Sequence, residues 1–316
     1  MSTPPGSRQR GAALLTAMII VTLVATLASG MIWQQWRAVQ VESAERSRVQ
    51  SAWILSGALD WARLILREDK RDFDHQSDIW GTPLAEARLS TFLAADKSNA
   101  EDGPEAFLSG SITDAQSRYN LRNLVDANKV APLEVEALKR LFQVISVSPA
   151  LADTIANGFN DALVVPGATP GSSRPATVPL LPQTVDQLAW LGIDADSIER
   201  MKPYVVILPI RTAVNVNTAA KEVLIAGIDG LDLGTAERMV QVRQRQPFKD
   251  LQDLKRLIPT LQVVQQRADV KSSFFEVRGR LRLEDRVLEE SSLVERRGND
   301  IIPLMRRRET SRENAG

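Results

Sequence analysis

Residues 8–33 read RQRGAALLTAMIIVTLVATLASGMIW, and this stretch decides how the chain is organised. From Ala12 to Trp33 no side chain is charged, and the only hydroxyl groups belong to three threonines and one serine. A helix rises about 1.5 Å per residue, so such a run crosses the roughly 30 Å hydrocarbon core of a bilayer. The sequence therefore predicts a single membrane-spanning helix over residues 12–36.

The residues that flank the apolar run predict its orientation. Arg8 and Arg10 lie directly before it, and positive charge favours the cytoplasmic side of a membrane. Trp33 and Trp36 lie near its other end, where amphipathic aromatic rings suit the interface between lipid and water. We therefore expect a cytoplasmic N-terminus and a globular part on the opposite side of the membrane.

A cleaved export signal is the alternative, because Ala28-Ser29-Gly30 supplies the small residues of a conventional cleavage site. The residues that follow disfavour this interpretation. Residues 37–69 contain no proline and continue a helical pattern, with an i,i+4 pair between Glu42 and Arg46. We expect one helix to leave the bilayer and to become the spine of a soluble domain. Its buried stripe is predicted to contain Ile54, Ala58, Trp61, Ala62 and Ile65, widened by Leu55, Leu59 and Leu66.

The string Arg8-Gln9-Arg10-Gly11 followed by Ala12-Ala13-Leu14-Leu15-Thr16 resembles the N-terminus of type IV pilin-like proteins. The resemblance implies that residues 1–11 are a leader, that a prepilin peptidase cuts between Gly11 and Ala12, and that the new N-terminus at Ala12 is methylated. Members of this class usually have glutamate at the fifth mature position, which here is Thr16. That departure is typical of the minor pseudopilin K family of type II secretion systems.

Length and composition limit what the remainder can be. Roughly 240 residues lie outside the membrane-embedded and tail portions, more than the usual 100 to 150 of one domain, which favours two lobes. The chain has 39 basic and 39 acidic residues, so no overall charge points to nucleic acid or to an anionic surface. No cysteine occurs, which excludes disulfides and thiol chemistry.

The middle of the chain combines strand-like and helical segments. Residues 106–123 have strand and turn character, and Asp114-Ala115-Gln116 with Tyr119-Asn120-Leu121-Arg122-Asn123-Leu124 resembles a signature of the K family. A generic strand with an asparagine-rich turn fits the same residues. Helices are predicted at 132–146, 151–159, 184–191 and 196–201, and a strand at 203–209. Five prolines between residues 164 and 182 predict a loop.

Residues 215–258, which begin with Asn215-Val216-Asn217-Thr218-Ala219, resemble a helix-hairpin-helix repeat. Such repeats bind DNA phosphates through backbone amides of a glycine hairpin. Here the hairpin is lengthened to residues 227–234 and contains Asp229 and Asp232. The segment has seven basic against six acidic residues, so counterion release would contribute little. We expect a helical packing module without nucleic acid, as the resemblance to the K family also implies.

Residues 272–296 predict a β-hairpin near the end of the chain. Phe275, Val277, Leu281 and Leu283 alternate with charged residues, and Glu284-Asp285-Arg286 forms the turn. This hairpin would complete the sheet that packs on the N-terminal helix. From residue 298 onward the composition is polar and basic, which predicts a disordered tail.

Together these features predict an α+β fold. A long N-terminal transmembrane and spine helix packs on an antiparallel sheet, as in pilins, and a large inserted α-helical domain contains the helix-hairpin-helix-like module. The predicted parts are a leader (1–11), a transmembrane segment (12–36), the first part of the pilin-like domain (37–124), the inserted domain (125–268), the C-terminal hairpin of the pilin-like domain (269–297) and the tail (298–316). The strand at 203–209 lies within the inserted domain or at its edge.

Few residues point to a cofactor or to catalysis. The K family often has an aspartate-rich calcium loop, but residues 158–167 read GFNDALVVPG here and leave only Asn160 and Asp161 as candidate ligands. We expect no cofactor, and calcium is disfavoured at this position. His75 is the sole histidine and is expected to be solvated. Neither a phosphate-binding loop, a zinc motif nor a nucleophile elbow occurs, so we expect no enzyme.

What the resemblance implies is an architectural role in the bacterial inner membrane and periplasm. A protein of this family would form a tip complex with minor pseudopilins I and J, contact other pseudopilins, initiate pseudopilus assembly and support protein export across the outer membrane. A minor pilin of a type IV pilus or a DNA-uptake machine is the alternative, although it would usually keep the glutamate. An anchored binding protein would not be cut after Gly11, and a tethered hydrolase would need catalytic residues that the sequence lacks.

Overall fold

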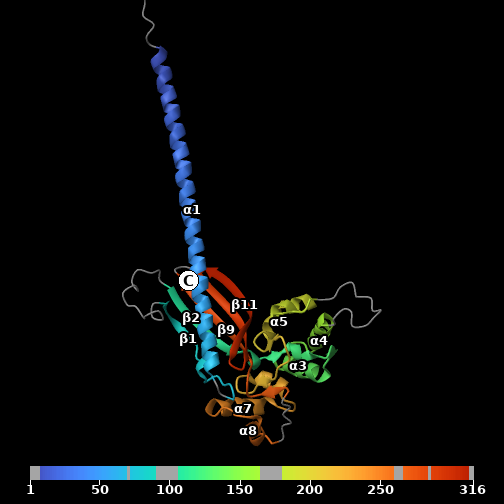
Figure 1. The fold of residues 1–316 in the computed structure, drawn as a ribbon. Coiled ribbons are helices and arrows are strands. Elements are labelled where there is room, and N and C mark those ends of the chain that lie inside the picture. The colour runs from blue at the N-terminus through green and yellow to red at the C-terminus, as the bar shows by residue number, and fades with distance from the viewer. Residues whose placement is uncertain are drawn as a thin grey trace, which may run out of the picture. The chain divides into compact units, whose positions relative to one another are not determined.

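Figure 1 shows the computed structural model, which describes residues 8–69, 72–89, 106–163, 180–259, 266–283 and 286–312. The chain consists of two compact units, residues 1–56 and residues 57–316. Helix α1 (Arg8–Glu68) begins in the first unit and ends in the second.

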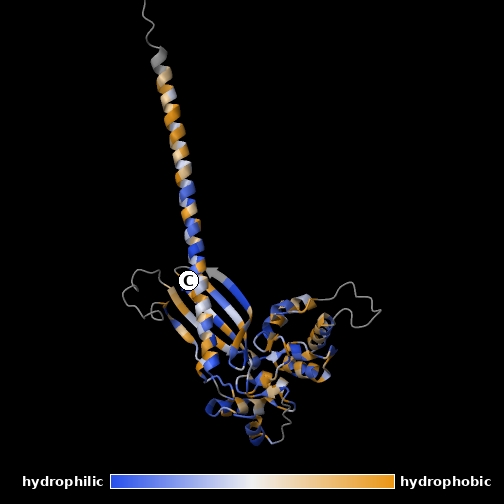
Figure 2. Cartoon of the chain, in the orientation of Figure 1, coloured by the Kyte–Doolittle hydropathy of each residue, from blue (hydrophilic) through white to orange (hydrophobic). Residues whose placement is uncertain are grey.

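In the first unit, α1 is apolar over its N-terminal half and becomes more polar further along (Figure 2). An 18-residue window of this helix has a mean hydropathy of 2.3, and none of it is buried. By length and composition, α1 is the one helix among the described residues that can cross a membrane. The predicted ion pair between Glu42 and Arg46 is present, with 2.7 Å between guanidinium nitrogen and carboxylate oxygen.

The second unit is built on a five-stranded antiparallel sheet with the strand order β1-β2-β9-β10-β11. Its strands are β1 (Leu84–Arg88), β2 (Ala106–Asp114), β9 (Phe274–Leu283), β10 (Arg286–Arg297) and β11 (Asp300–Arg312). Strands β9 and β10 form the predicted hairpin, with Val287 opposite Arg282 and Val294 opposite Phe275. Because β2 and β9 are neighbours in the sheet, everything between residues 115 and 273 is inserted between two adjacent strands.

Strand β11 corrects the prediction of a disordered tail over residues 298–316. It pairs with β10 from Asp300 to Arg312 and places Ile301 in the apolar core. It is an edge strand of the sheet, where charged side chains are common because they discourage uncontrolled pairing. The basic composition that predicted disorder therefore belongs to an edge strand, and residues 313–316 lie outside the described part.

The apolar core of the sheet forms against the last turns of α1. Leu59, Ala62 and Leu66 pack with the residues Trp80, Ile112, Phe275, Val277, Val294 and Ile301. The rings of Trp80 and Phe275 meet edge to face, with centroids 5.2 Å apart. Trp80 lies in the short helix η1 (Ile79–Gly81), which joins α1 to β1.

The predicted position of Trp61 in this core is wrong. Its side chain is 51% exposed, whereas Leu59, Ala62 and Leu66 are at most 6% exposed. Successive residues of a helix differ by about 100°, so a stripe centred on 59, 62 and 66 turns residue 61 away from the sheet. The predicted buried stripe of α1 therefore had the correct helical period, but it was centred on the wrong residues.

The inserted region is mostly helical. Its first part contains η2 (Ala115–Ser117), η3 (Leu121–Leu124), α3 (Pro132–Val144), α4 (Ala150–Leu163), η4 (Val185–Leu191) and α5 (Ala195–Met201). Of these, α3, α4, η4 and α5 confirm the four predicted helices with shifts at their ends, whereas η2 and η3 lie in residues predicted as strand and turn. Tyr119, Phe142 and Phe159 are almost fully buried in the core of this region. The proline-rich segment at 164–179 lies outside the described residues.

Short strand pairs connect the inserted helices. The predicted strand at 203–209 is reduced to β6 (Val205–Val206), which pairs in parallel with β3 (Tyr119–Asn120). Strands β4 (Val125–Asp126) and β5 (Lys129–Val130) form a small hairpin. The helix-hairpin-helix-like part contains α6 (Lys221–Gly227), α7 (Leu233–Arg245) and α8 (Leu251–Leu257), and it is enclosed by the parallel pair β7 (Val214–Asn215) and β8 (Ala268–Asp269).

Candidate functional site

The most densely connected polar site in the described part of the chain lies where the inserted region leaves the sheet and returns to it. We call it the polar joint, and it consists of Asp74, Asp114, Asn215, Thr218, Ser272 and Arg296. Asp114 ends β2, and Ser272 precedes β9 by two residues. The joint therefore ties the two ends of the insertion together.

Asp114 is the centre of the polar joint. One of its carboxylate oxygens accepts hydrogen bonds from Asn215 Nδ2 at 2.9 Å, Thr218 Oγ1 at 2.6 Å and Ser272 Oγ at 2.7 Å. The other accepts the backbone N–H of Gln116 at 2.8 Å, which starts the turn η2. Burial raises the pKa of the Asp114 carboxyl above its ordinary 3.8, although these hydrogen bonds oppose the shift.

Asp74 connects the joint to the end of β10. Its carboxylate accepts the backbone N–H of Ser272 at 2.7 Å and a hydrogen bond from Arg296 Nη2 at 2.6 Å. The same Arg296 nitrogen donates to the carbonyl of Ser272 at 2.8 Å, and its guanidinium lies over the ring of Phe275 at 4.8 Å. Burial raises the pKa of Asp74, while the bond from Arg296 lowers it.

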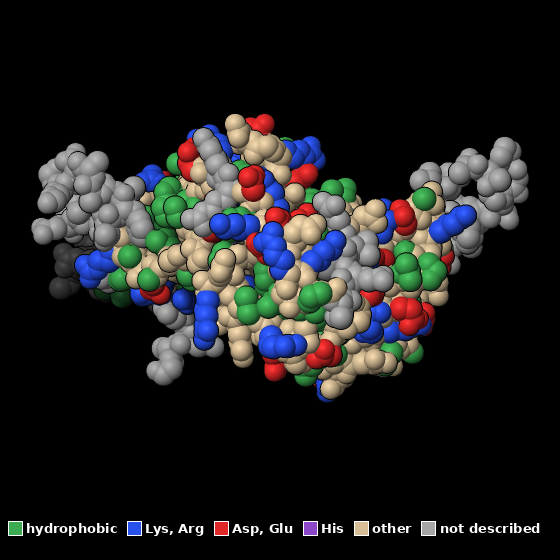
Figure 3. Space-filling model, turned by 90° about the horizontal axis from the view of Figure 1, so that it is seen from below, with side chains coloured by type: hydrophobic (Ala, Val, Ile, Leu, Met, Phe, Trp, Pro, Cys, Tyr) green, Lys and Arg blue, Asp and Glu red, His purple; other side chains and the backbone are tan. Residues whose placement is uncertain are grey.

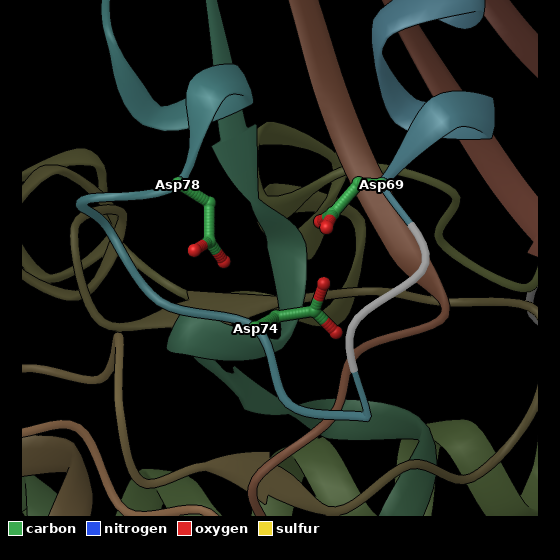
Figure 4. Close-up of side chains that lie close together, drawn as sticks. All are labelled: Asp69, Asp74 and Asp78. Carbon is green, nitrogen blue, oxygen red and sulfur yellow. The ribbon is translucent and has the colours of Figure 1, made fainter.

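Asp69, Asp74 and Asp78 form the one group of three carboxylates in the described residues that lies close enough to hold a metal ion. Figure 4 shows Asp69 at the end of α1 and the other two in the loop that follows. Arg296 already supplies positive charge here, 3.7 Å from Asp69 as well as against Asp74. Asp78 accepts the backbone N–H of His75 at 2.8 Å. The cluster is therefore explained by an arginine and a tight loop.

The loop also corrects the prediction that His75 is solvated. The histidine is 6% exposed, and its Nδ1 lies 2.8 Å from Ser77 Oγ. The charged residues around it in sequence predicted a solvated loop. The loop is instead held down by hydrogen bonds to Val270 and Ser272, which are distant in sequence.

The asparagines of the first signature hold the segment that precedes the helix-hairpin-helix-like module. Asn120 Oδ1 accepts the N–H of Leu208 at 3.1 Å, and its Nδ2 donates to the carbonyl of Ile210 at 2.7 Å. Asn123 Nδ2 donates to the carbonyl of Thr212 at 2.8 Å, and its Oδ1 accepts the N–H of the same residue at 3.0 Å. Residues 208–212 are thereby fixed without a long strand.

The module itself is held by buried polar contacts. Asn217 exchanges two hydrogen bonds with the backbone of Phe248, at 2.8 and 2.9 Å. Arg243 donates to the carbonyl of Val216 at 2.6 Å, and burial lowers the pKa of its guanidinium to about 10. The Asn215-Val216-Asn217-Thr218 string therefore serves internal packing, since all four of its residues accept or donate buried hydrogen bonds.

The two aspartates of the hairpin also have structural partners. Asp232 caps α7 by accepting the N–H of Thr235 at 2.9 Å, at the helix end where a phosphate would bind. Asp229 pairs with Arg140 and with Arg267, at 2.6 Å each. Figure 3 shows basic and acidic side chains interspersed on the face at the α7 and α8 end of the molecule. This geometry does not favour a nucleic acid.

A second buried charge cluster lies behind Asp229. Arg267 is 3.1 Å from a carboxylate oxygen of Glu134, whose other oxygen accepts a hydrogen bond from Tyr119 Oη at 2.8 Å. Burial and the neighbouring carboxylate raise the pKa of the Tyr119 hydroxyl well above its ordinary value. The cluster links α3 to the segment that leads back to β8, and every member has a partner.

The comparison with known protein families decides the identity. Residues 117–210 and residues 214–274 each match a sequence model of Type II secretion system protein K. The two matches together cover the inserted region from just after β2 to the start of β9. The chain belongs to the type II secretion system protein K family.

Relatives in this family extend the match along the chain. The type II secretion system protein K of Pseudomonas aeruginosa is 28% identical over 78% of this chain and 75% of its own length. That of Pectobacterium carotovorum is 26% identical over 95% of this chain and 96% of its own length. The protein of Klebsiella pneumoniae is 29% identical over 67% of each chain. The chain is therefore a minor pseudopilin, and the alternative of a type IV pilus or DNA-uptake protein is not favoured.

The fold matches a solved structure as well. A chain in the crystal structure of the GspK-GspI-GspJ complex from enterotoxigenic Escherichia coli Type 2 Secretion System superposes with a TM-score of 0.62. The match has 18% sequence identity and covers 85% of this chain and 99% of that one. It supports the predicted α+β fold with a long N-terminal helix.

The residues predicted from the protein K family lie in two places. Thr16 lies in the apolar part of α1, and its hydroxyl donates to the carbonyl of Ala12 at 2.9 Å. Thr22, Thr26 and Ser29 also donate to carbonyls of the preceding turn. The helix includes Gly11, but the side chains before Ala12 are outside the described part. Position 16 therefore has a neutral group whose hydroxyl is satisfied within its own helix.

The calcium candidates lie at the end of α4. Asp161 is exposed, and Asn160 is partly buried with an Oδ1 that has no hydrogen bond. Residues 164–179, where further ligands of a family calcium loop would come from, are not described. Among the described residues, Asp161 belongs to no group of three possible metal ligands, and the group that the structure does bring together was not predicted.

Sequence reasoning identified two strings of the polar joint and missed its other half. Asp114 and Asn215 both lie in strings that resemble the protein K family. Asp74, Ser272 and Arg296 have no local signal, because Ser272 meets Asp114 across 158 residues of sequence, and Asp74 meets Ser272 and Arg296 across 198 and 222.

Proposed function

We propose that this chain is the tip subunit of a type II secretion pseudopilus, where it initiates assembly and supports export of proteins across the outer membrane. The observation that carries the proposal is Thr16, whose hydroxyl is satisfied within its own helix at 2.9 Å from the Ala12 carbonyl. A carboxylate at this depth in the bilayer needs a partner, and the N-terminus of a neighbouring subunit supplies one in a shaft. A subunit without that carboxylate suits the first position, which has no earlier neighbour.

The inserted region supports the same position. Residues 115–273 extend a pilin-like sheet by a helical region larger than the sheet itself. Subunits of a helical shaft contact neighbours on several sides, so such a region would clash there. At the end of the filament one side is open.

The polar joint contributes to this role by holding the inserted region to the sheet. A subunit at the tip transmits force from the filament to whatever it meets, so its two parts need a connection that does not bend. Buried hydrogen bonds among five chain segments supply one.

The proposed processing and membrane topology are those of type IV pilin-like proteins. A prepilin peptidase would remove residues 1–11 and leave Ala12 as a methylated N-terminus. The chain would then remain in the bacterial inner membrane by a single helix, with its globular part in the periplasm. Partners would be minor pseudopilins I and J and other pseudopilins, which is supported by the GspK-GspI-GspJ complex that contains the similar fold. We propose no enzymatic activity and no cofactor.

Immunogold labelling of pseudopili tests the position. Pseudopili are sheared from cells that produce this chain with an epitope after residue 312, and a shaft subunit with its own epitope serves as control. We expect gold for this chain at one end only, and gold for the control along the whole filament. Label distributed along the shaft would contradict a tip position.

A further inference from the structure

The two edges of the five-stranded sheet differ in how they are protected. Strand β1 is five residues long, and its register shifts between Leu84 and Ala87. Strand β11 is 13 residues long, and its only irregularity lies near Pro303. From Met305 to Arg312 it pairs with β10 in unbroken register. An edge of this length is unusual, because natural sheets normally shorten or distort exposed edges.

The free side of β11 presents unpaired backbone groups. Among the described residues, no strand pairs with the side of β11 that faces away from β10. In an antiparallel sheet, alternate residues of an edge strand direct their N–H and C=O groups outward. The regular stretch from Met305 to Arg312 offers such groups over about 26 Å, at about 3.3 Å per residue.

Three consecutive side chains of this stretch are basic. Arg306, Arg307 and Arg308 are exposed, and Glu309 is the one acidic residue beside them. Arg308 is paired with the buried Glu290 at 2.7 Å. No ion pair in the described part of the chain includes Arg306 or Arg307. The edge therefore has two cationic groups that no described residue neutralises.

These two arginines lie on opposite faces of the sheet. Arg306 pairs across from Ser292 and Arg307 from Ser291, and successive side chains of a strand alternate in direction. On the face of Arg307, a hollow of about 490 Å³ crosses the sheet and is also lined by Ser291, Arg280 and Glu289. There Arg280 already pairs with Glu289 at 3.4 Å. A strand added to β11 would thus meet a cation on each of its faces.

We propose that the free edge of β11, from Met305 to Arg312, binds an extended acidic segment of another protein by adding it to the sheet as a sixth strand. Backbone hydrogen bonds would supply most of the contact, and acidic side chains on both faces would meet Arg306 and Arg307. A second copy of this chain is a poor occupant, because pairing two β11 edges places arginines opposite arginines. This surface does not depend on the tip position proposed above.

Binding of defined peptides to the full chain in detergent tests the proposal. The probe is a fluorescent peptide of about ten residues in which glutamate alternates with valine and threonine. One control peptide has lysine in place of glutamate, and another is N-methylated at alternate residues so that it cannot pair on one side. We expect the acidic peptide to bind and both controls to fail, as measured by fluorescence anisotropy.

Charge reversal on the protein separates specific pairing from general attraction. The variant with Arg306→Glu and Arg307→Glu should weaken binding of the acidic peptide by at least about tenfold. A matched variant with Arg245→Glu and Arg256→Glu changes the net charge equally at exposed sites away from β11 and should bind as the unmodified chain does. Amide exchange of residues 305–312 should slow on binding.

Several results would overturn the proposal. These are absence of binding by the acidic peptide, equal binding by the N-methylated peptide, and equal loss of binding in the two charge-reversed variants. Circular dichroism of each variant shows that a loss of binding is not a loss of folding, since all four arginines are exposed.

Discussion

The apolar core under α1 and the polar joint lie in the same unit, but different physics holds each of them together. The core joins Leu59, Ala62 and Leu66 to Phe275 and its neighbours through burial of apolar surface. The joint centres on a carboxylate that is almost fully buried and accepts four hydrogen bonds. The core tolerates small shifts because packing is not directional. The joint does not, because each of its bonds fixes both a distance and a direction.

The core and the joint therefore have different roles in the fold. Apolar packing determines that the helix lies on the sheet, whereas the joint determines where the inserted region leaves the sheet and returns. A carboxylate with a raised pKa is a costly way to make that connection. In exchange, its hydrogen bonds give the connection a fixed distance and direction. The predictions below test that division.

The largest expected loss comes from the core. Phe275→Ala removes a fully buried ring that packs on Trp80, and it should lower the free energy of unfolding by about 3 to 5 kcal/mol. Urea unfolding of the detergent-solubilised chain, followed by near-ultraviolet circular dichroism, measures the change. Phe107→Ala on the partly exposed part of β2 is the matched control and should cost less than half as much.

A substitution in the polar joint should also lower the free energy of unfolding, by a somewhat smaller amount. Asp114→Ala leaves the donors of Asn215, Thr218 and Ser272 without their acceptor, which should cost about 3 kcal/mol. It should also speed amide exchange at residues 215–218 and 272, which Phe275→Ala should affect less. A cost below about 1 kcal/mol would mean that the joint does not fix the insertion.

The joint and the core should also differ in their response to pH. The pKa values of Asp74 and Asp114 are raised in the folded chain, so the folded state binds protons more readily than the unfolded state. The contribution of these carboxyls to stability is therefore present below the ordinary 3.8 and is lost as the pH rises through the raised values. Asp114→Asn, which does not titrate, should reduce this loss.

Urea midpoints over a pH series measure that response. Asp72→Asn is the control, because it removes a fully exposed carboxyl from the same loop, outside the joint. Phe275→Ala should shift all midpoints by a similar amount. If the urea midpoints of Asp114→Asn and of the unmodified chain changed with pH in parallel, the pH dependence would not come from the joint.

The corrected position of Trp61 predicts a small effect. Trp61→Ala should change the free energy of unfolding by no more than about 0.5 kcal/mol, because half of the side chain is already exposed. Trp80→Ala, in which the tryptophan is 2% exposed, should cost several times more. A large loss for Trp61→Ala would place the core stripe of α1 on a different face.

The smallest effect is expected from calcium. Removal of calcium with a chelator and its return should leave the melting temperature unchanged, because Asp161 is the one carboxylate of this pair and belongs to no group of three possible ligands in the described part of the chain. Asp161→Ala should then behave as the unmodified chain does. A calcium-dependent rise in melting temperature that Asp161→Ala removes would show a site at this position.

Periodic patterns in the sequence predicted much of the apolar packing well. The alternation of Phe275, Val277 and Leu281 predicted β9 and its buried face, and the helical spacing in residues 132–146 predicted α3. Trp61 shows the limit of this method. A helical period in the sequence indicates that one face of the helix is buried, but it does not show which residues lie at the centre of that face. β11 shows another limit, because the composition of an edge strand resembles that of a disordered tail.

The polar joint could not be predicted in the same way. A buried aspartate such as Asp114 or Asp74 has no local pattern that distinguishes it from a surface aspartate. Its environment is created by residues such as Ser272 and Arg296, which are brought together only by the complete fold. The strings around Asp114 and Asn215 were recognised by resemblance, and their role became clear only from their contacts.

The central claim is that the chain is a pseudopilin whose mature form begins at Ala12, and intact mass tests it most directly. The chain is produced together with a prepilin peptidase, extracted from membranes and measured by mass spectrometry. The account predicts loss of Met1 to Gly11, with a methyl group on Ala12. An uncut chain, or one cut near Ser29, would contradict it.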